Sequence, residues 1–346
     1  MVSSCRAIQR KFYDYIIIMN RSLTRSSRTQ ITPLPLPTTD FTGKTVIVTG
    51  ANTGLGKAAA QHFIRLKAAR VILACRSVAK GEEAKAEIGR FDDHAASAAE
   101  VWEVDLASFE SVEQFCARAN QLERLDVLIA NAGLQSFTYE AYEGYERQTT
   151  VHVISTFLMA LLLLPIMRKA MAEFGSQAHQ VIVNSNGHMY TTFQTRLGEE
   201  TAFGAVKGDK NMRYRYYDTK LMQVFVVREL AARLKASGKP LVVLNLVDPG
   251  YCQSELLRTK EWELPIRIMM AVADRALART ADMGARTYVM AASAGRESHG
   301  LYLEDCGFST PSPFVETNEG RELQGRIFGE LVEILDRVEP GIWDNV

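Results

Sequence analysis

The chain has 346 residues with 40 basic and 40 acidic side chains, so its formal net charge is zero. This length accommodates one large α/β domain or two small ones. Balanced charge argues against nucleic acid as the main partner, because nucleic-acid binding usually needs a basic surface. The five cysteines have wide spacings and no CxxC pair, which excludes a disulfide framework and a zinc site. We therefore expect no metal and a reducing, cytoplasmic location.

Residues 1–39 form a basic leader ahead of the predicted domain. Residues 1–30 carry six Lys or Arg against one acid, Asp14. The apolar run Tyr15–Met19 is much too short to cross a bilayer, and no secretory cleavage site follows it. A flexible leader without a transmembrane segment is predicted, and a mitochondrial presequence is the alternative.

From residue 44 onward, short β-branched runs alternate with longer helical stretches. Strands are predicted at 44–49, 70–74, 100–104, 125–130, 180–184, 240–247 and 301–303, and helices at 55–67, 80–90, 108–122, 142–172, 216–235 and 281–294. This alternation predicts βαβ units, and continuous apolar runs fit strands buried on both faces. The predicted fold class is α/β, a Rossmann-type doubly wound parallel sheet in three layers. It forms a single domain over residues 40–340, with excursions at 187–215 and 256–278.

A glycine-rich turn joins the first predicted strand to the first helix. Thr49–Gly56 reads TGANTGLG and places Gly50, Gly54 and Gly56 at the junction. There the backbone can approach a pyrophosphate, and the start of the helix offers free N–H groups and the positive end of its dipole. Because Lys57 is followed by alanine, the segment is not a Walker A loop. The turn predicts a dinucleotide site.

A second motif places a phenol and an ammonium one helical turn apart, at Tyr216 and Lys220. On a helix both side chains point the same way. A free phenol has a pKa of about 10. A nearby ammonium should lower that pKa towards neutrality, where general acid–base catalysis is most efficient. Together with the dinucleotide site, the pair predicts hydride transfer with Tyr216 as the proton donor or acceptor.

Four motifs, in this order, resemble the short-chain dehydrogenase/reductase family. They are TGANTGLG, Ala130–Gly133 (ANAG), Tyr216–Lys220 (YxxxK) and Pro249-Gly250, and the resemblance covers about residues 40–310. The segments Ile72–Ser77 and Thr156–Pro165 are similar to fungal members that serve secondary-metabolite pathways. His188 resembles a histidine of retinol-dehydrogenase-like relatives, but as a lone loop histidine it is given no chemical role.

The resemblance implies where a cofactor binds. The family selects its cofactor at the end of the second strand, where this chain has Cys75 followed by Arg76. A neutral residue followed by a guanidinium favours the 2′-phosphate, so we expect NADP(H). The implied cofactor-binding residues are Gly50, Asn52, Gly54, Leu55, Gly56, Arg76, Asp105, Asn131, Tyr216, Lys220 and Ser254.

The resemblance also implies four catalytic positions: Ser185, Tyr216, Lys220 and His152. Ser185 would hydrogen-bond the substrate oxygen. At the position of His152 the family usually has Asn, which holds a water that relays protons to the lysine. A histidine can hold water and can itself carry a proton, or its bulk can disturb the helix. An active enzyme and a dinucleotide-binding scaffold or regulator with little catalysis are therefore both open.

The two excursions lie where loops beside a rigid scaffold commonly determine specificity. Trp262, Ile266 and Met269 belong to the second, which falls where the family has its substrate lid. Such side chains fit two interpretations, a helix that packs on its own core and a lid over a large apolar or aromatic substrate. In the second interpretation, the expected substrate is a hydrophobic ketone or secondary alcohol of polyketide type. The family often dimerises through the long helix and the tyrosine helix. The lid and the C-terminal tail would obstruct that surface, so a monomer and a homodimer are both open.

Overall fold

The computed structural model describes residues 30, 32–90, 97–193, 201–205, 212–253, 256, 275 and 277–346. Within them lies one large sheet of eight strands. Its strands are β1 (Thr45–Thr49), β2 (Arg70–Cys75), β3 (Ala99–Glu103), β4 (Val127–Ala130), β7 (His179–Val183), β8 (Val243–Asp248), β9 (Tyr302–Glu304) and β10 (Gly307–Ser309). Their spatial order is β10-β9-β8-β7-β4-β1-β2-β3. Every neighbouring pair is parallel except β9 and β10.

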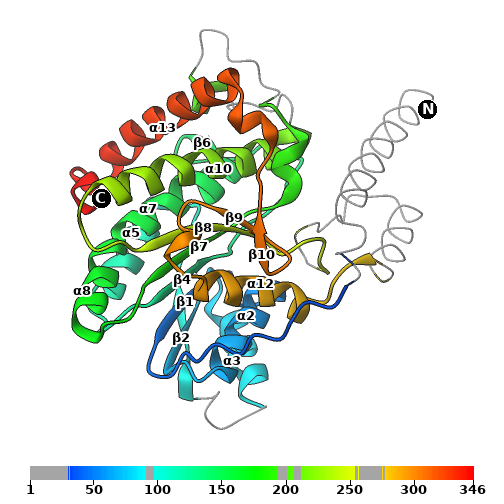
Figure 1. The fold of residues 1–346 in the computed structure, drawn as a ribbon, viewed down its shortest axis with the longest axis vertical. Coiled ribbons are helices and arrows are strands. Elements are labelled where there is room, and N and C mark those ends of the chain that lie inside the picture. The colour runs from blue at the N-terminus through cyan, green and yellow to red at the C-terminus, as the bar shows by residue number, and fades with distance from the viewer. Residues whose placement is uncertain are drawn as a thin grey trace.

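Helices cover both faces of this sheet, which makes three layers (Figure 1). The longer ones are α2 (Gly54–Arg65), α3 (Val78–Gly89), α5 (Phe109–Ala119), α7 (Ser155–Leu162), α8 (Leu164–Phe174), α10 (Met212–Ala236), α12 (Ala281–Ser293) and α13 (Asn318–Val338). The short elements are β5 (Ala141–Tyr142), β6 (Tyr145–Glu146), α6 (Arg147–Thr149), η1 (Thr150–Ile154), η2 (Asn186–Tyr190), α9 (Ala202–Ala205), η3 (Arg296–Ser298), η4 (Pro313–Glu316) and η5 (Ile342–Asn345). The predicted Rossmann-type α/β fold is confirmed.

The central strand β1 shows why the sequences of these strands are continuous apolar runs. Successive side chains of a strand point to opposite faces of the sheet. Ile47 therefore packs in the same core as Phe157 of α7, whereas Val46 and Val48 pack on the other face with Phe63 of α2. All five side chains of β1 itself are fully or almost fully buried. Both faces are thus apolar, as expected for a parallel sheet between two helical layers.

The predicted helix at 142–172 is wrong in its first turn and interrupted further on. Its first residues instead form the hairpin β5–β6, and helix begins at Arg147. Glu146 ends the hairpin and caps the helix, because its carboxylate accepts hydrogen bonds from the backbone N–H groups of Gln148 and Thr149. Between α6 and α7 the chain then forms the π-helix η1.

The helical stretch Arg147–Phe174 is long and apolar enough to cross a membrane, with a mean hydropathy of 2.1 in its most apolar window. However, 89% of that window is buried inside the protein. Among the described residues it is the one helix that meets these criteria. Its burial identifies it as the core helix of this layer, since one apolar helix within a folded core satisfies the same test as a membrane span.

Helix α13 has no counterpart among the predicted elements. It is amphipathic, and its buried face includes Ile327, Phe328, Leu331 and Leu335. It packs along α10, and the C-terminal turn η5 returns to place Trp343 against Phe328 (Figure 1). One surface of the tyrosine-bearing helix is therefore covered by the chain itself.

The excursions and the leader are described only in part. In 187–215, the α9 segment docks on α13, because the Glu330 carboxylate accepts hydrogen bonds from the N–H groups of Ala202 and Phe203. Nearly all of the predicted lid at 256–278 lies outside the described residues, as do residues 1–29 of the leader. At the end of the leader, the buried Gln30 side chain donates to the carbonyls of Tyr251 and Leu277.

Replacing Leu331 with alanine is expected to destabilise the protein by about 2–5 kcal/mol, because it leaves a cavity at a fully buried position of α13. The free energy of unfolding in urea measures this effect. Glu333→Ala, two residues away on the exposed face, is the matched control and should change it by less than about 0.5 kcal/mol. Equal effects of the two substitutions would show that α13 is not packed on the core.

Candidate active site

Three positions of the turn between β1 and α2 favour glycine, two because of their backbone conformation and one because of space. Gly50 has φ +67° and Gly54 has φ +55°, both in the left-handed region that side chains rarely adopt. Gly56 is restricted by space instead. A Cβ there would lie 2.5 Å from the carbonyl oxygen of Gly50 and 2.6 Å from the Nδ2 atom of Asn131. Gly50 and Gly54 therefore allow the conformation of the turn, and Gly56 allows its close packing against Gly50 and Asn131.

The first turn of α2 is open to an anion. The side chain of its N-cap residue, Thr53, makes no capping hydrogen bond, and the first turn contains no acidic residue. The first N–H groups of a helix have no partner within the helix, and the dipole is positive at this end. Asn52 and Leu55, half-buried, flank these groups. The residues present fit the pyrophosphate of a dinucleotide.

The other predicted cofactor residues follow the carboxyl ends of β2, β3 and β4. Arg76 is exposed directly after β2, and no residue that the structure describes forms an ion pair with it. The Asp105 carboxylate accepts a hydrogen bond from the N–H of Ala107 and so shapes its own turn. Asn131 donates to the carbonyl of Thr49 at 2.8 Å and accepts from the Tyr288 hydroxyl at 3.1 Å. Asn131 thus fixes the end of β1 against α12.

Ser185, Tyr216 and Lys220 lie together at the same edge of the sheet. Ser185 follows β7, and its side chain is hydrogen-bonded to the hydroxyl of Tyr216 on α10. Lys220 lies one turn further along α10, with its Nζ 5.7 Å from the centre of the Tyr216 ring. The tyrosine is 9% exposed and the lysine 5% exposed. The ring of the fourth predicted residue, His152, packs edge-to-face against the ring of Tyr216, with ring centres 5.8 Å apart. The structure therefore brings all four predicted catalytic side chains together in a nearly dry environment.

The predicted lowering of the Tyr216 pKa is wrong for this environment. Burial raises the pKa of Tyr216 above its ordinary value, and the hydrogen bond with Ser185 opposes the rise only in part. Burial also lowers the pKa of Lys220 to about 7, an effect that the negative charge of Asp248 opposes. Desolvation is the largest cause of both shifts, and it favours the neutral form of each group. Tyr216 is protonated in this state.

The fourth predicted residue, His152, is held by the protein on both ring nitrogens. Its Nε2 accepts a hydrogen bond from the N–H of Leu134 at 3.0 Å, and its Nδ1 lies 2.9 Å from the hydroxyl of Thr219. That hydroxyl donates to the carbonyl of Tyr216, so the ring is neutral with its proton on Nδ1. Burial, then the charge of Lys220, keeps the pKa of His152 well below its usual range. This arrangement is at odds with the predicted role as a proton carrier.

Asp248 is a site residue that the sequence analysis missed. Its buried carboxylate accepts hydrogen bonds from the N–H groups of Asn186 and Gly250 and from the Tyr302 hydroxyl. It therefore ties the loop after β7 to the Pro-Gly turn after β8. Burial, reinforced by the nearby charge of Glu304, raises the pKa of Asp248 to about 6. The sequence does contain a signal for this residue. Asp248 is an acid at the end of an apolar strand, directly before a Pro-Gly pair.

Two further predictions concern residues near this edge. His188 is fully buried, with its Nδ1 2.7 Å from the carbonyl oxygen of Ser185 and its Nε2 accepting from the N–H of Ser312. It is a local hydrogen-bonding residue, as its loop position suggested. Ser254 lies outside the described residues.

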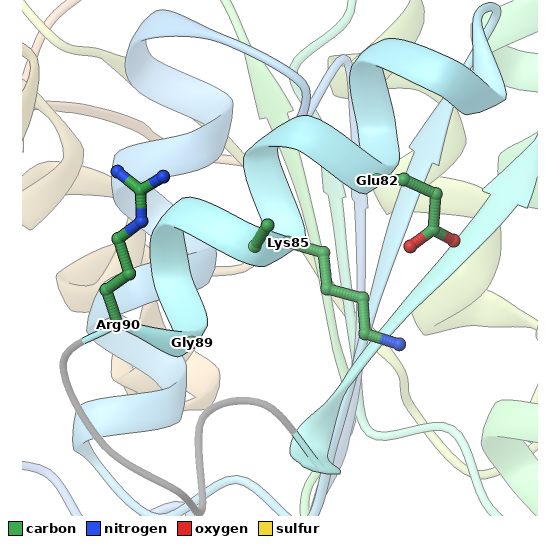
Figure 2. A pocket seen from close by; sticks show the side chains of 5 residues that line it. Glu82, Lys85, Gly89 and Arg90 are labelled. Atoms are coloured by element: carbon green, nitrogen blue, oxygen red, sulfur yellow. The ribbon is translucent and has the colours of Figure 1, made fainter.

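A surface depression of about 370 Å³ lies elsewhere, along α3. Its lining residues are Glu82, Lys85, Ala86, Gly89 and Arg90. Figure 2 shows the side chains of Glu82, Lys85 and Arg90 pointing in different directions, so their charges do not converge on one ligand position. A binding site generally needs a few convergent polar groups, and we assign no function to this depression.

Comparison with known proteins agrees with this geometry. The family model for short chain dehydrogenases matches residues 44–194. The chain is 42% identical over 318 residues to the short chain dehydrogenase/reductase dmxR8 of Cryptosporiopsis sp., covering 90% of this chain and 96% of that protein. It is 43% identical over 288 residues to the short chain dehydrogenase atnD of Emericella nidulans, covering 82% and 90%.

A crystal structure of an uncharacterised protein from Mycobacterium paratuberculosis has the same fold. Its TM-score is 0.63 at 26% identity, and the match covers 87% of this chain and 98% of that chain. The glycine-rich turn, the buried Ser-Tyr-Lys cluster and these matches define a dinucleotide-dependent oxidoreductase. The chain belongs to the short-chain dehydrogenase/reductase family, whose members use NAD(P) cofactors.

Gly56→Ala tests the close-packed turn. A methyl group 2.5 Å from a backbone oxygen forces the turn apart, so we expect a loss of about 1–3 kcal/mol of stability and weakening of NADPH binding by at least about tenfold. Thermal unfolding and a fluorescence titration measure the two effects. Gly325→Ala is the control, because its Cβ would meet nothing within 4 Å in an exposed turn of α13. If Gly56→Ala binds NADPH normally, the turn is not the pyrophosphate site.

Proposed function

We propose that this protein is an NADP(H)-dependent carbonyl reductase or alcohol dehydrogenase acting on a hydrophobic ketone and its secondary alcohol. The observation that carries the proposal is the buried cluster of Ser185, Tyr216 and Lys220, which lies at the same sheet edge as the open N-terminus of α2. A proton donor and a dinucleotide site at one edge are the requirements of reversible hydride transfer.

The cofactor, when bound, supplies or receives a hydride at the carbonyl carbon. The Ser185 hydroxyl orients the carbonyl oxygen, and the protonated phenol of Tyr216 gives its proton to that oxygen. The phenolate that remains is a charge in a buried site, and the ammonium of Lys220 stabilises it. In the opposite direction Tyr216 takes the proton from the alcohol. Because burial keeps Tyr216 protonated, the side chain is ready for ketone reduction.

Aromatic side chains next to Ser185 support an apolar substrate. Tyr190 packs edge-to-face against Tyr217, with ring centres 6.1 Å apart, and Tyr217 in turn contacts the ring of Tyr216. Apolar walls with a few fixed polar groups are typical of sites for small organic molecules. The similarity to fungal short chain dehydrogenases supports a role in secondary-metabolite biosynthesis. From the aromatic side chains we infer a polyketide-type substrate.

Tyr216→Phe removes the proton donor and retains the ring. The rate of ketone-dependent NADPH oxidation should fall by about 10²–10⁴-fold, while the NADPH dissociation constant stays within about threefold, because the lost group acts on the substrate. Tyr217→Phe is the matched control on the same turn and should retain activity. A wild-type protein that binds NADPH without turning over a broad ketone panel would instead favour the scaffold alternative.

Arg76→Ala tests cofactor choice. Loss of a charge-assisted bond to the 2′-phosphate should weaken NADPH binding by about 10–100-fold and leave NADH binding unchanged. Lys80→Ala, another exposed cation near the start of α3, is the control. Equal loss of both nucleotides in Arg76→Ala would mean that the guanidinium does not read the 2′-phosphate.

A further inference from the structure

Gln223 connects the buried ammonium of Lys220 to the π-helix of the neighbouring core helix. It lies three residues after Lys220 on α10 and is 2% exposed. Its Oε1 accepts hydrogen bonds from Lys220 Nζ at 3.2 Å and from Asn184 Nδ2 at 3.1 Å. Its Nε2 donates to the main-chain carbonyl of His152 at 2.8 Å. A single side chain thus bridges three elements beneath the candidate catalytic residues.

The orientation of this amide is determined by its neighbours. An ammonium can only donate hydrogen bonds and a carbonyl can only accept them. The amide oxygen must therefore face Lys220, and the amide NH₂ must face His152. The reverse orientation would set NH₂ against the ammonium and oxygen against oxygen. The His152 carbonyl belongs to η1, and single π-helical turns within α-helices occur frequently at functional sites.

The position of His152 makes this carbonyl a fixed anchor. Both nitrogens of its ring are bound, to Leu134 and Thr219, so the residue cannot rotate freely. A second support comes from Asn184, whose Nδ2 also donates to the main-chain carbonyl of Lys220 at 2.9 Å. The other acceptor of the ammonium is the carbonyl oxygen of Val183 at 2.8 Å. Gln223 is therefore the one side-chain acceptor recorded for Lys220 among the described residues.

We propose that Gln223 is a positioning residue that holds the ammonium of Lys220 beside Tyr216 and favours its charged form. The His152 ring supports this bond by fixing the carbonyl to which Gln223 is anchored. The catalytic significance of this contact rests on the proposed reductase function, but the contact and its effect on Lys220 do not. A proton-carrying role for the His152 ring is then unnecessary. His152 is connected to Lys220 through its own main-chain carbonyl and the side chain of Gln223.

Two nearly isosteric variants should move the ionisation of Lys220 in opposite directions. Gln223→Met removes the acceptor and should lower the pKa of Lys220 by about one unit. Gln223→Glu replaces it with a carboxylate and should raise that pKa by about one unit or more. Asp248 on β8, Tyr216 on α10 and the neutral His152 on η1 also face Lys220, and they are unchanged in both variants.

The measurement is a pH titration of the lysine Cε chemical shift in apoprotein labelled with ¹³Cε-lysine. The Lys220 signal is identified by its absence in Lys220→Arg. The alkaline limb of kcat/KM for NADPH-dependent ketone reduction should move in the same direction as the Lys220 pKa in each variant. Gln324→Met is the matched control, because Gln324 also bridges charged side chains, Arg228 and Glu229, at the contact between α10 and α13.

Opposite shifts in the two variants, with no shift in Gln324→Met, support the proposal. A Lys220 titration in Gln223→Met that stays within about 0.3 unit of wild type overturns it, whatever Gln223→Glu shows. Should Gln223→Met fail to fold, Gln223→Asn replaces it, because the shorter side chain withdraws the amide oxygen from Lys220 and should also lower its pKa. If the wild type shows no turnover, the reductase function fails, and the apoprotein titration still tests Gln223 by itself.

Discussion

The burial of one ammonium group constrains much of the structure around the candidate active site. A lysine in the interior loses its hydration, and it remains only if carbonyl and amide oxygens replace the lost water. Here the end of β7, the side chain of Gln223 and the charge of Asp248 supply that replacement. The compensation is incomplete, because burial still lowers the pKa of Lys220 below its ordinary value.

This arrangement depends on the order of the strands. β7 and β8 are neighbours, so their carboxyl ends bring Ser185 and Asp248 together, at the same edge of the parallel sheet as the glycine-rich turn after β1. Helix α10 then crosses this edge with Tyr216, Lys220 and Gln223 on consecutive turns. The covering helix α13 holds α10 from the other side, and a rigid scaffold of this kind is what places catalytic groups with the required accuracy.

Several features of the site were accessible from local patterns. Tyr216 and Lys220 have a helical spacing that puts both on one face, and the glycines of Thr49–Gly56 mark a turn with positive φ. The strands were recognisable because residues buried on both faces leave an uninterrupted apolar run. Asp248 and Gln223 were not recognised. Each is one polar residue in an apolar segment, and its role depends on partners 39 to 71 residues away in the sequence.

The sequence by itself therefore determined the class of fold, the dinucleotide turn and the tyrosine–lysine pair, because helix and strand periodicity act over a few residues. Tertiary structure determined the ionisation of the buried side chains at the candidate active site. Whether the ammonium lowers the pKa of Tyr216 or burial raises it depends on how much water the packed helices exclude, and no local spacing encodes that quantity. The neutral, doubly bonded state of His152 and the packing of α13 on α10 were decided in the same way, by contacts between distant segments.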